Sequence, residues 1–89
     1  MSDTERERIE RVCAAFGAAL SEHLIGNGKG VEWPVVDDAF LAMRCEQEVA
    51  ELRYEVDYVG RTGAAHEALD VGAFAMMIWD NMARMERSQ

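Results

Sequence analysis

The run Val71–Trp79 contains no charged side chain, and it constrains the fold more than any other feature of the chain. Apolar residues recur through it and beyond it with a heptad-like helical spacing, at Val71, Ala75, Ile78, Met82 and Met85. A helix that is apolar on nearly all sides is central and is covered from several directions. The run is too short to span a membrane. We therefore expect a central helix that one small chain covers incompletely.

Length and composition indicate a single all-α domain that spans residues 1–89. The chain has 89 residues and one proline, and it is rich in Ala, Glu, Met and Arg, which favour helices. A chain this short buries a modest core and often depends on oligomerisation for stability. We expect the protein to associate with copies of itself.

Three segments have the periodicity of helices, and they cover about 4–25, 37–59 and 63–86. Ser2 or Asp3 is suited to cap the first helix, and Thr62 to cap the third. Gly60 is the expected breaker at the end of the second. We expect the second and third helices to form an antiparallel hairpin.

The second helix has two different stripes at helical spacing. One stripe is apolar and consists of Val49, Leu52, Val56 and Val59. The other consists of Arg44, Glu48, Glu51 and Glu55. We interpret the first as the packing face and the second as an acidic face. On the first helix, the apolar stripe comprises Ile9, Val12, Cys13, Phe16, Ala19, Leu20 and Leu24.

Two acidic pairs stand three residues apart, Glu48 with Glu51 and Glu67 with Asp70. Each pair shares a face of its helix. In an antiparallel hairpin the four carboxylates can converge, and they then repel one another unless a cation lies among them. Hard divalent cations prefer such all-oxygen surroundings. The sequence thus points to Mg²⁺, with Mn²⁺ as the alternative ion.

An ordinary acidic surface is the competing interpretation of these pairs. Acidic residues number 17 of 89, so about three acidic pairs at this spacing are expected by chance. The chain has three, the third being Glu7 with Glu10. Asp70 favours the metal site, because it lies between Leu69 and Val71, where an unpaired carboxylate is costly.

The formal net charge of −8 argues against direct binding to nucleic acid, which requires basic patches. Cys13 and Cys45 have no zinc-like spacing, and we expect them to be small apolar residues in a reducing cytosol. The N-terminal residues are charged and contain no apolar signal segment. These features predict a cytoplasmic protein.

The stretch Glu48-Val-Ala-Glu51-Leu52, followed by Glu67-Ala-Leu-Asp70-Val71, resembles the paired acidic motif of the MazG-like nucleotide pyrophosphohydrolases. His66 to Trp79 is similar to the third-helix signature of small phage and archaeal members. The resemblance covers about residues 33–82. It implies an all-α fold whose dimers or tetramers build four-helix-bundle cores. It also implies Mg²⁺-dependent hydrolysis of a nucleoside triphosphate to the monophosphate and pyrophosphate.

By this resemblance Glu48, Glu51, Glu67 and Asp70 are the metal ligands. A carboxylate that is not fully used in coordination can accept the proton of the attacking water, and Glu51 is our choice. Four residues are candidates for substrate binding: Trp33, Arg44, Arg61 and Asn81. For Arg44, a salt bridge to Glu48 one turn along the helix is the competing interpretation. His66 is a weaker candidate, and His23 has no expected role.

A second hypothesis belongs to another class of function. An acidic helical protein can block a nucleic-acid-binding partner by presenting carboxylates in place of phosphates, as a phage inhibitor of host defence would. That role requires acids spread over a surface, such as Glu46, Glu55, Asp57 and the glutamates of the first helix. The enzyme requires the two acidic pairs to meet in one place. The positions of these side chains discriminate between the two hypotheses.

Overall fold

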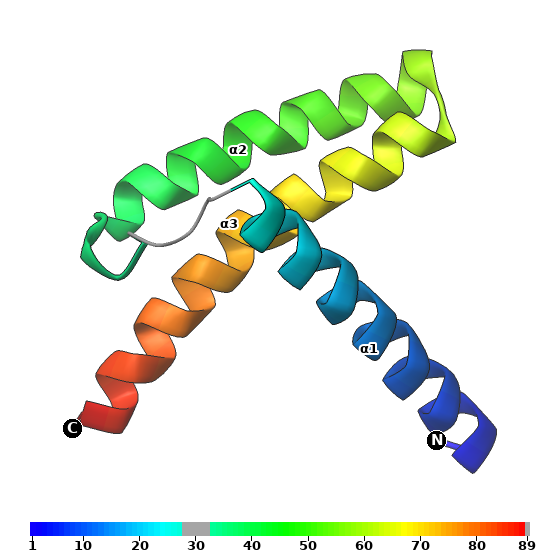
Figure 1. Cartoon of the computed structure of the whole chain (residues 1–89), viewed down its shortest axis with the longest axis horizontal. Helices are drawn as coiled ribbons and strands as arrows, with labels where there is room; N and C mark the ends of the chain where they lie inside the picture. Colours follow the sequence, from blue (N-terminus) through cyan, green and yellow to red (C-terminus); the bar gives the residue numbers. More distant parts are fainter. Residues whose placement is uncertain (28–32, 89) are drawn as a thin grey trace.

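The computed structural model describes residues 1–27 and 33–88, with side chains as far as residue 85, and these residues form an all-α structure without strands (Figure 1). The helices are α1 (Asp3–Gly26), α2 (Asp38–Tyr54) and α3 (Arg61–Ser88). A 3₁₀ turn, η1 (Trp33–Val35), precedes α2, and a π-helical turn, η2 (Glu55–Val59), extends it. The expected fold class is confirmed. None of the described helices has the length and apolarity that crossing a membrane requires.

The helix ends follow local capping chemistry. The side chain of Ser2 accepts a hydrogen bond from the backbone N–H of Glu5 at 3.1 Å, and that of Asp37 accepts from Ala39 at 3.1 Å. Both bonds satisfy N–H groups that have no partner within the helix. These caps lie where the sequence predicts the first two helices to begin.

The break between α2 and α3 requires glycine. Gly60 has φ +148°, a backbone region that side chains disfavour. Helix α3 then begins at Arg61, and the N–H of Ala64 already donates to the carbonyl of Gly60 at 3.0 Å. The prediction that Thr62 caps this helix is therefore wrong, because Gly60 ends one helix and leads directly into the next.

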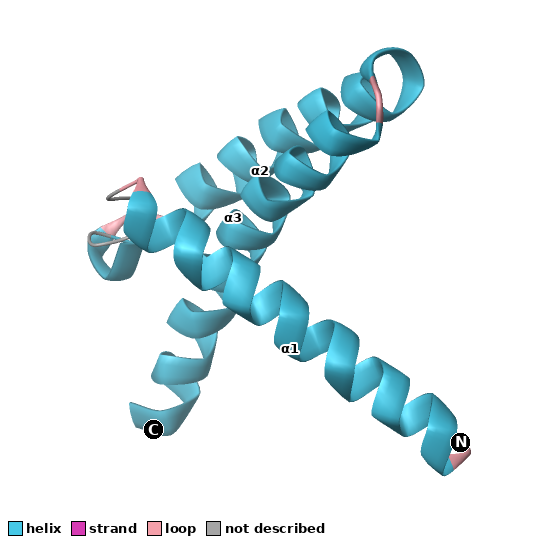
Figure 2. Cartoon of the chain, turned by 45° about the vertical axis from the view of Figure 1, so that its right-hand side comes forward, coloured by secondary structure: helices cyan, strands magenta, loops and turns pink. Residues whose placement is uncertain are grey.

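The chain is an antiparallel hairpin of α2 and α3 with α1 laid across it (Figures 1 and 2). The first half of α3 runs beside α2, whereas its second half diverges toward the C-terminus. Helix α1 crosses α3 near its own C-terminal end. The buried core is small and consists of Leu20, Leu24, Leu41, Ala73 and Met77.

Close approach between α1 and α3 depends on the absence of a side chain at Gly72. A Cβ atom built there would lie 2.5 Å from Cζ of Phe16. The aromatic ring of α1 therefore rests on the bare backbone of α3. Together with Leu20 and Leu24, this contact brings the C-terminal half of α1 onto the hairpin.

The apolar stripe of α2 is oriented differently from the expectation. Within one chain the apolar stripe points largely to solvent, with Val49 47 %, Val56 64 % and Val59 62 % exposed. From the acidic stripe, Glu48 is buried and Glu55 is half-buried. The hairpin thus turns the acidic stripe toward α3, as the expected convergence of the two acidic pairs requires.

The apolar stripe of α1 is also only partly covered. Every residue from Met1 to Ala18 is exposed, and burial begins near Leu20. The N-terminal half of α1 projects away from the hairpin in both views (Figures 1 and 2). Ile9, Val12 and Phe16 therefore present an apolar surface that the described part of a single chain leaves open.

Candidate metal centre

Three of the four predicted carboxylates converge between the helices of the hairpin. Glu48 comes from α2, and Glu67 and Asp70 come from α3. One oxygen of each lies within 4.8 Å of the others. The spacing of three residues puts Glu67 and Asp70 on the same face of α3. The antiparallel packing of α2 then brings Glu48 opposite them.

Two oxygens of this cluster lack the partners that burial requires. Glu48 is only 6 % exposed, and its Oε2 atom is buried without a hydrogen bond among the described residues. Oε2 of Glu67 is in the same condition, as is Oε2 of the nearby Glu55. A buried carboxylate oxygen without a partner is unfavourable. The cluster therefore has unmet capacity for a positively charged ligand.

The pKa of Glu48 reflects the same unfavourable surroundings. Burial is the main cause that raises its pKa from 4.5 to about 7, followed by the neighbouring carboxyl group of Glu51. The carboxyl groups of Glu67 and Asp70 raise it further. Either a proton or a metal ion relieves this repulsion.

Glu51, the fourth predicted ligand and the predicted general base, occupies a different position. It is exposed, and it does not belong to the set of oxygens within 4.8 Å of one another. It lies one turn from Glu48 on α2, and its carboxyl group raises the pKa of Glu48. Its carboxylate is thus at the border between the cluster and solvent.

Arg44 makes the salt bridge that was the competing interpretation of this residue. Its Nη2 atom donates to Oε1 of Glu48 at 3.1 Å, and its Nη1 atom donates to Gln47. The guanidinium carbon also lies 5.4 Å from the centre of the Phe74 ring, within the range of a cation–π contact. Arg44 is half-exposed, so a positive charge lies at the edge of the acidic cluster.

Two other predicted substrate-binding residues lie together, but away from the carboxylates. The indole N–H of Trp33 donates to Asp80 at 3.0 Å. The amide of Asn81 donates to the carbonyl of Trp33 at 3.2 Å and to Asp38 at 2.8 Å. Asn81 is eleven residues beyond Asp70 on α3, which is about 16 Å along the helix axis. The structure therefore gives both residues a role in fastening η1 to α3.

The last predicted substrate-binding residue, Arg61, is exposed at the first position of α3. It is on the same helix as Glu67 and Asp70, on the N-terminal side of both. No described contact ties it to the carboxylate cluster.

A histidine that sequence reasoning left without a role lies against the cluster. His23 from α1 makes a 2.6 Å contact from Nε2 to Oδ1 of Asp70, and its side chain is only 7 % exposed. Its ring also meets His66 edge-on, with the ring centres 5.1 Å apart. A signal was present in the sequence, because His23 shares the buried side of α1 with Leu20 and Leu24.

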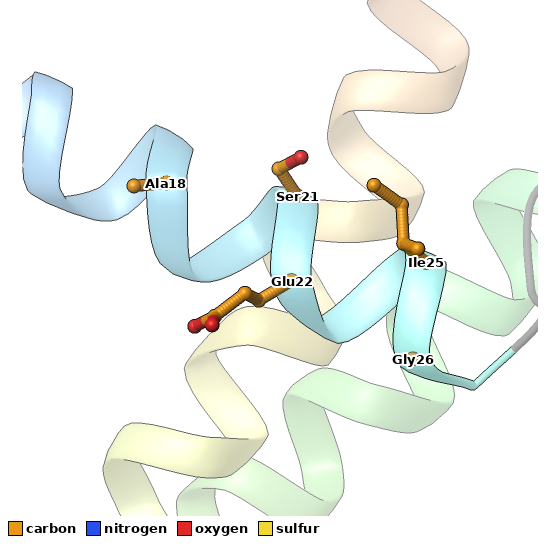
Figure 3. Close-up of a pocket in the computed structure, with 5 residues that line it drawn as sticks. All are labelled: Ala18, Ser21, Glu22, Ile25 and Gly26. Carbon is orange, nitrogen blue, oxygen red and sulfur yellow. The ribbon is translucent and has the colours of Figure 1, made fainter.

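A surface hollow lies elsewhere, along α1. Figure 3 shows its lining residues, all on this one helix: Ala18, Ser21, Glu22, Ile25 and Gly26. None of these is a predicted site residue, and none belongs to the carboxylate cluster. The hollow is a groove on one helix, and it lacks the converging polar groups that mark a binding site.

Comparison with known proteins gives no relative: no family model, no curated protein and no solved structure matches this chain.

Proposed function

We propose that the protein is a Mg²⁺-dependent hydrolase that converts a nucleoside triphosphate to the monophosphate and pyrophosphate. The observation that supports this proposal is the convergence of Glu48, Glu67 and Asp70, with a buried, unpartnered oxygen on each of the two glutamates. An acidic cluster on a surface is common and needs no ligand. A carboxylate that is 6 % exposed and has an unpartnered oxygen beside two further acids is a different case, because a metal ion or a proton must offset the repulsion.

The residues present fit a hard divalent cation. Glu48, Glu67 and Asp70 would hold it, and Glu51 would join them or contact its bound water. All these donors are carboxylate oxygens, the type that Mg²⁺ and Mn²⁺ accept. When bound, the ion would supply charge neutralisation for the phosphates and a bound water of lowered pKa.

The remaining chemistry falls to side chains at the edge of the cluster. Glu51 is exposed and stands beside Glu48, so it can accept a proton from an attacking water. Arg44 has five guanidinium N–H groups and uses only some of them on Glu48 and Gln47. Those that remain can donate to a phosphate oxygen. Trp33 and Asn81 have no role at the phosphates in this proposal.

Pyrophosphate release from a panel of ribo- and deoxynucleoside triphosphates tests the proposal. Each triphosphate is assayed with Mg²⁺ and with EDTA, for the wild type, Asp70→Asn and Glu46→Gln. Glu46 is an exposed acid on α2, so its variant controls for loss of one surface charge. We expect release that requires Mg²⁺, disappears in Asp70→Asn and persists in Glu46→Gln. Silence across the panel from a folded protein would refute the enzyme and favour the acidic inhibitor.

Two of the acids named for the inhibitor's surface contribute less to it than their positions in the sequence suggest. Asp57 pairs with Arg53 at 3.3 Å, and one oxygen of Glu55 is buried. The inhibitor hypothesis requires both residues on the surface that imitates phosphates. An acid that is neutralised or turned inward contributes little to such a surface.

We also propose that the working form is a homodimer or a homotetramer. The apolar stripe of α2 and the projecting half of α1 both expose large apolar side chains. Trp79, Met82 and Met85 on the diverging half of α3 are exposed as well. A second copy that packs on these helices would complete a four-helix-bundle core. Sedimentation equilibrium tests this proposal, and a monomer at micromolar concentration would contradict it.

A further inference from the structure

We infer that His23 is a positioning residue for Asp70, and that α1 thereby belongs to the metal centre. The inference rests on the proposed function and names a residue that neither the acidic motif nor its resemblance covers. The contact joins residues 47 positions apart in the chain, across the crossing of α1 and α3. The contact is 2.6 Å from Nε2 to Oδ1, shorter than the 3.1 Å between Arg44 and Glu48.

The direction of this hydrogen bond follows from the chemistry of the two groups. An ionised carboxylate can only accept, so Nε2 of His23 donates its proton to Oδ1 of Asp70. The side-chain amide nitrogen of Asn27 lies 3.3 Å from Nδ1 and can only donate, so Nδ1 is the acceptor of this contact. Asn27 also donates to the backbone carbonyl of His23 at 2.7 Å. Both ring nitrogens are engaged, which fixes the tautomer and the plane of the imidazole.

The surroundings hold the ring in place. His66 meets it edge-on at an interplanar angle of 88°. Leu20 and Leu24 anchor the same turn of α1 in the core, and Phe16 rests on Gly72 of α3. A side chain that is 7 % exposed and held from several sides can impose an orientation on its partner.

The consequence for Asp70 is a restricted carboxylate. Its free side chain would rotate among several orientations, and only some place an oxygen near Glu48 and Glu67. The bond from His23 holds the orientation in which an oxygen lies within 4.8 Å of both. Residues that orient metal ligands through hydrogen bonds typically change metal affinity by roughly 10- to 100-fold when they are replaced. Asp70 keeps further lone pairs for a cation, because one carboxylate offers about four.

Binding of Mn²⁺ alone, followed by the electron paramagnetic resonance signal of the free ion, tests this role. Three variants of the full chain are compared with the wild type. His23→Phe keeps a ring of similar size and removes the donor, whereas His23→Gln keeps an N–H donor. His66→Phe is the matched control, because it replaces the neighbouring ring that contacts His23 only edge-on. Circular dichroism verifies that each variant has kept its helices.

We expect His23→Phe to bind Mn²⁺ roughly 10- to 100-fold more weakly than the wild type. His23→Gln should recover most of the affinity, and His66→Phe should retain it. Wild-type affinity in His23→Phe would overturn the inference and leave the proposed function standing. An equal loss in His66→Phe would also overturn it, because packing of the ring pair would then be the cause. A wild type that binds no Mn²⁺ would refute the proposed function itself, and this inference with it.

Discussion

Arg44 donates a hydrogen bond to Oε1 of Glu48 at 3.1 Å, while Oε2 of the same carboxylate is buried without a partner among the described residues. The salt bridge thus provides a partner for Oε1 and leaves Oε2 without one. Since Arg44 is half-exposed, its guanidinium lies on the solvent side of Glu48. The buried, unpartnered Oε2 atom of Glu48 is the basis of the first two predictions.

Replacing Glu48 by Gln should stabilise the metal-free protein at pH 8. The pKa of the Glu48 carboxyl group is raised to about 7 by burial and by Glu51, so at pH 8 the folded protein holds an unfavourable charge there. Glutamine removes this charge and keeps the shape of the side chain. We expect a gain in the free energy of unfolding of roughly 1 to 3 kcal/mol in EDTA. Urea denaturation measures it, with Glu46→Gln as the exposed control. A destabilised variant would mean that the ionised form of Glu48 is already well compensated.

The stability of the metal-free protein should depend on pH through Glu48. Its pKa rises from 4.5 to about 7 on folding, so the folded state holds this proton more tightly than the unfolded chain. The resulting stabilisation is fully present below pH 4.5 and is lost as the pH rises through about 7. The loss is on the order of 3 kcal/mol. Urea unfolding from about pH 4.5 to about pH 8 measures it, and the wild type should lose more stability than Glu48→Gln. Parallel curves would contradict the assignment.

Adding Mg²⁺ should stabilise the folded wild type. A ligand that binds only the native state at 100 times its Kd contributes about 2.7 kcal/mol. For a domain of this size, that is a shift of roughly 10 to 20 °C in the midpoint of thermal unfolding. Differential scanning fluorimetry in Mg²⁺ and in EDTA measures the shift. Asp70→Asn should abolish it and Glu46→Gln should keep it, and an equal shift in Asp70→Asn would exclude that carboxylate as a ligand.

Adding a methyl group at Gly72 should loosen α1 from α3. The new Cβ would meet Cζ of Phe16 at 2.5 Å, and the ring would have to move. We expect Gly72→Ala to lose about 1 kcal/mol of stability by overpacking. Gly17→Ala is the matched control, since a Cβ there meets nothing within 4 Å and an alanine favours the helix. Urea denaturation of the two variants should therefore give changes of opposite sign, and matching changes would show that the Phe16 contact carries no energy.

A charge in the apolar stripe of α2 should weaken self-association. Val56 is 64 % exposed in one chain, and an aspartate there would be buried without a partner if a second copy covered the stripe. We expect Val56→Asp to weaken the dimer at least tenfold in sedimentation equilibrium. Ala50→Asp, on the exposed face that also bears Arg53, is the control and should leave the dimer intact. Equal assembly of both variants would move the interface elsewhere.

Local features of the fold were accessible from the sequence because each depends on a few neighbouring residues. Ser2 and Asp37 cap their helices through hydrogen bonds two or three residues along the chain. Gly60 ends a helix because its backbone needs a conformation that other residues disfavour. The spacing that puts Glu67 and Asp70 on one face is a property of any α-helix. Thr62 was misjudged because a glycine that breaks one helix can begin the next.

The candidate site was predicted in part for the same reason. The helical spacing and an antiparallel hairpin were sufficient to bring Glu48 to Glu67 and Asp70. They did not determine that Glu51 would remain exposed, because a small rotation of α2 about its axis moves that side chain across the border of the cluster. Nor did they place Trp33, whose indole bonds to Asp80 instead of lying at the carboxylates.

The sequence by itself determined the three helices, most of their ends and the acidic residues that can meet. Only the tertiary structure decided that the apolar stripe of α2, which includes Val56, faces solvent within one chain. It alone decided that His23 reaches Asp70 across 47 positions of chain. The physical reason is that helix formation depends on bonds within a few residues. The rotation and crossing of whole helices depend instead on packing contacts between residues far apart in the chain, such as Phe16 on Gly72.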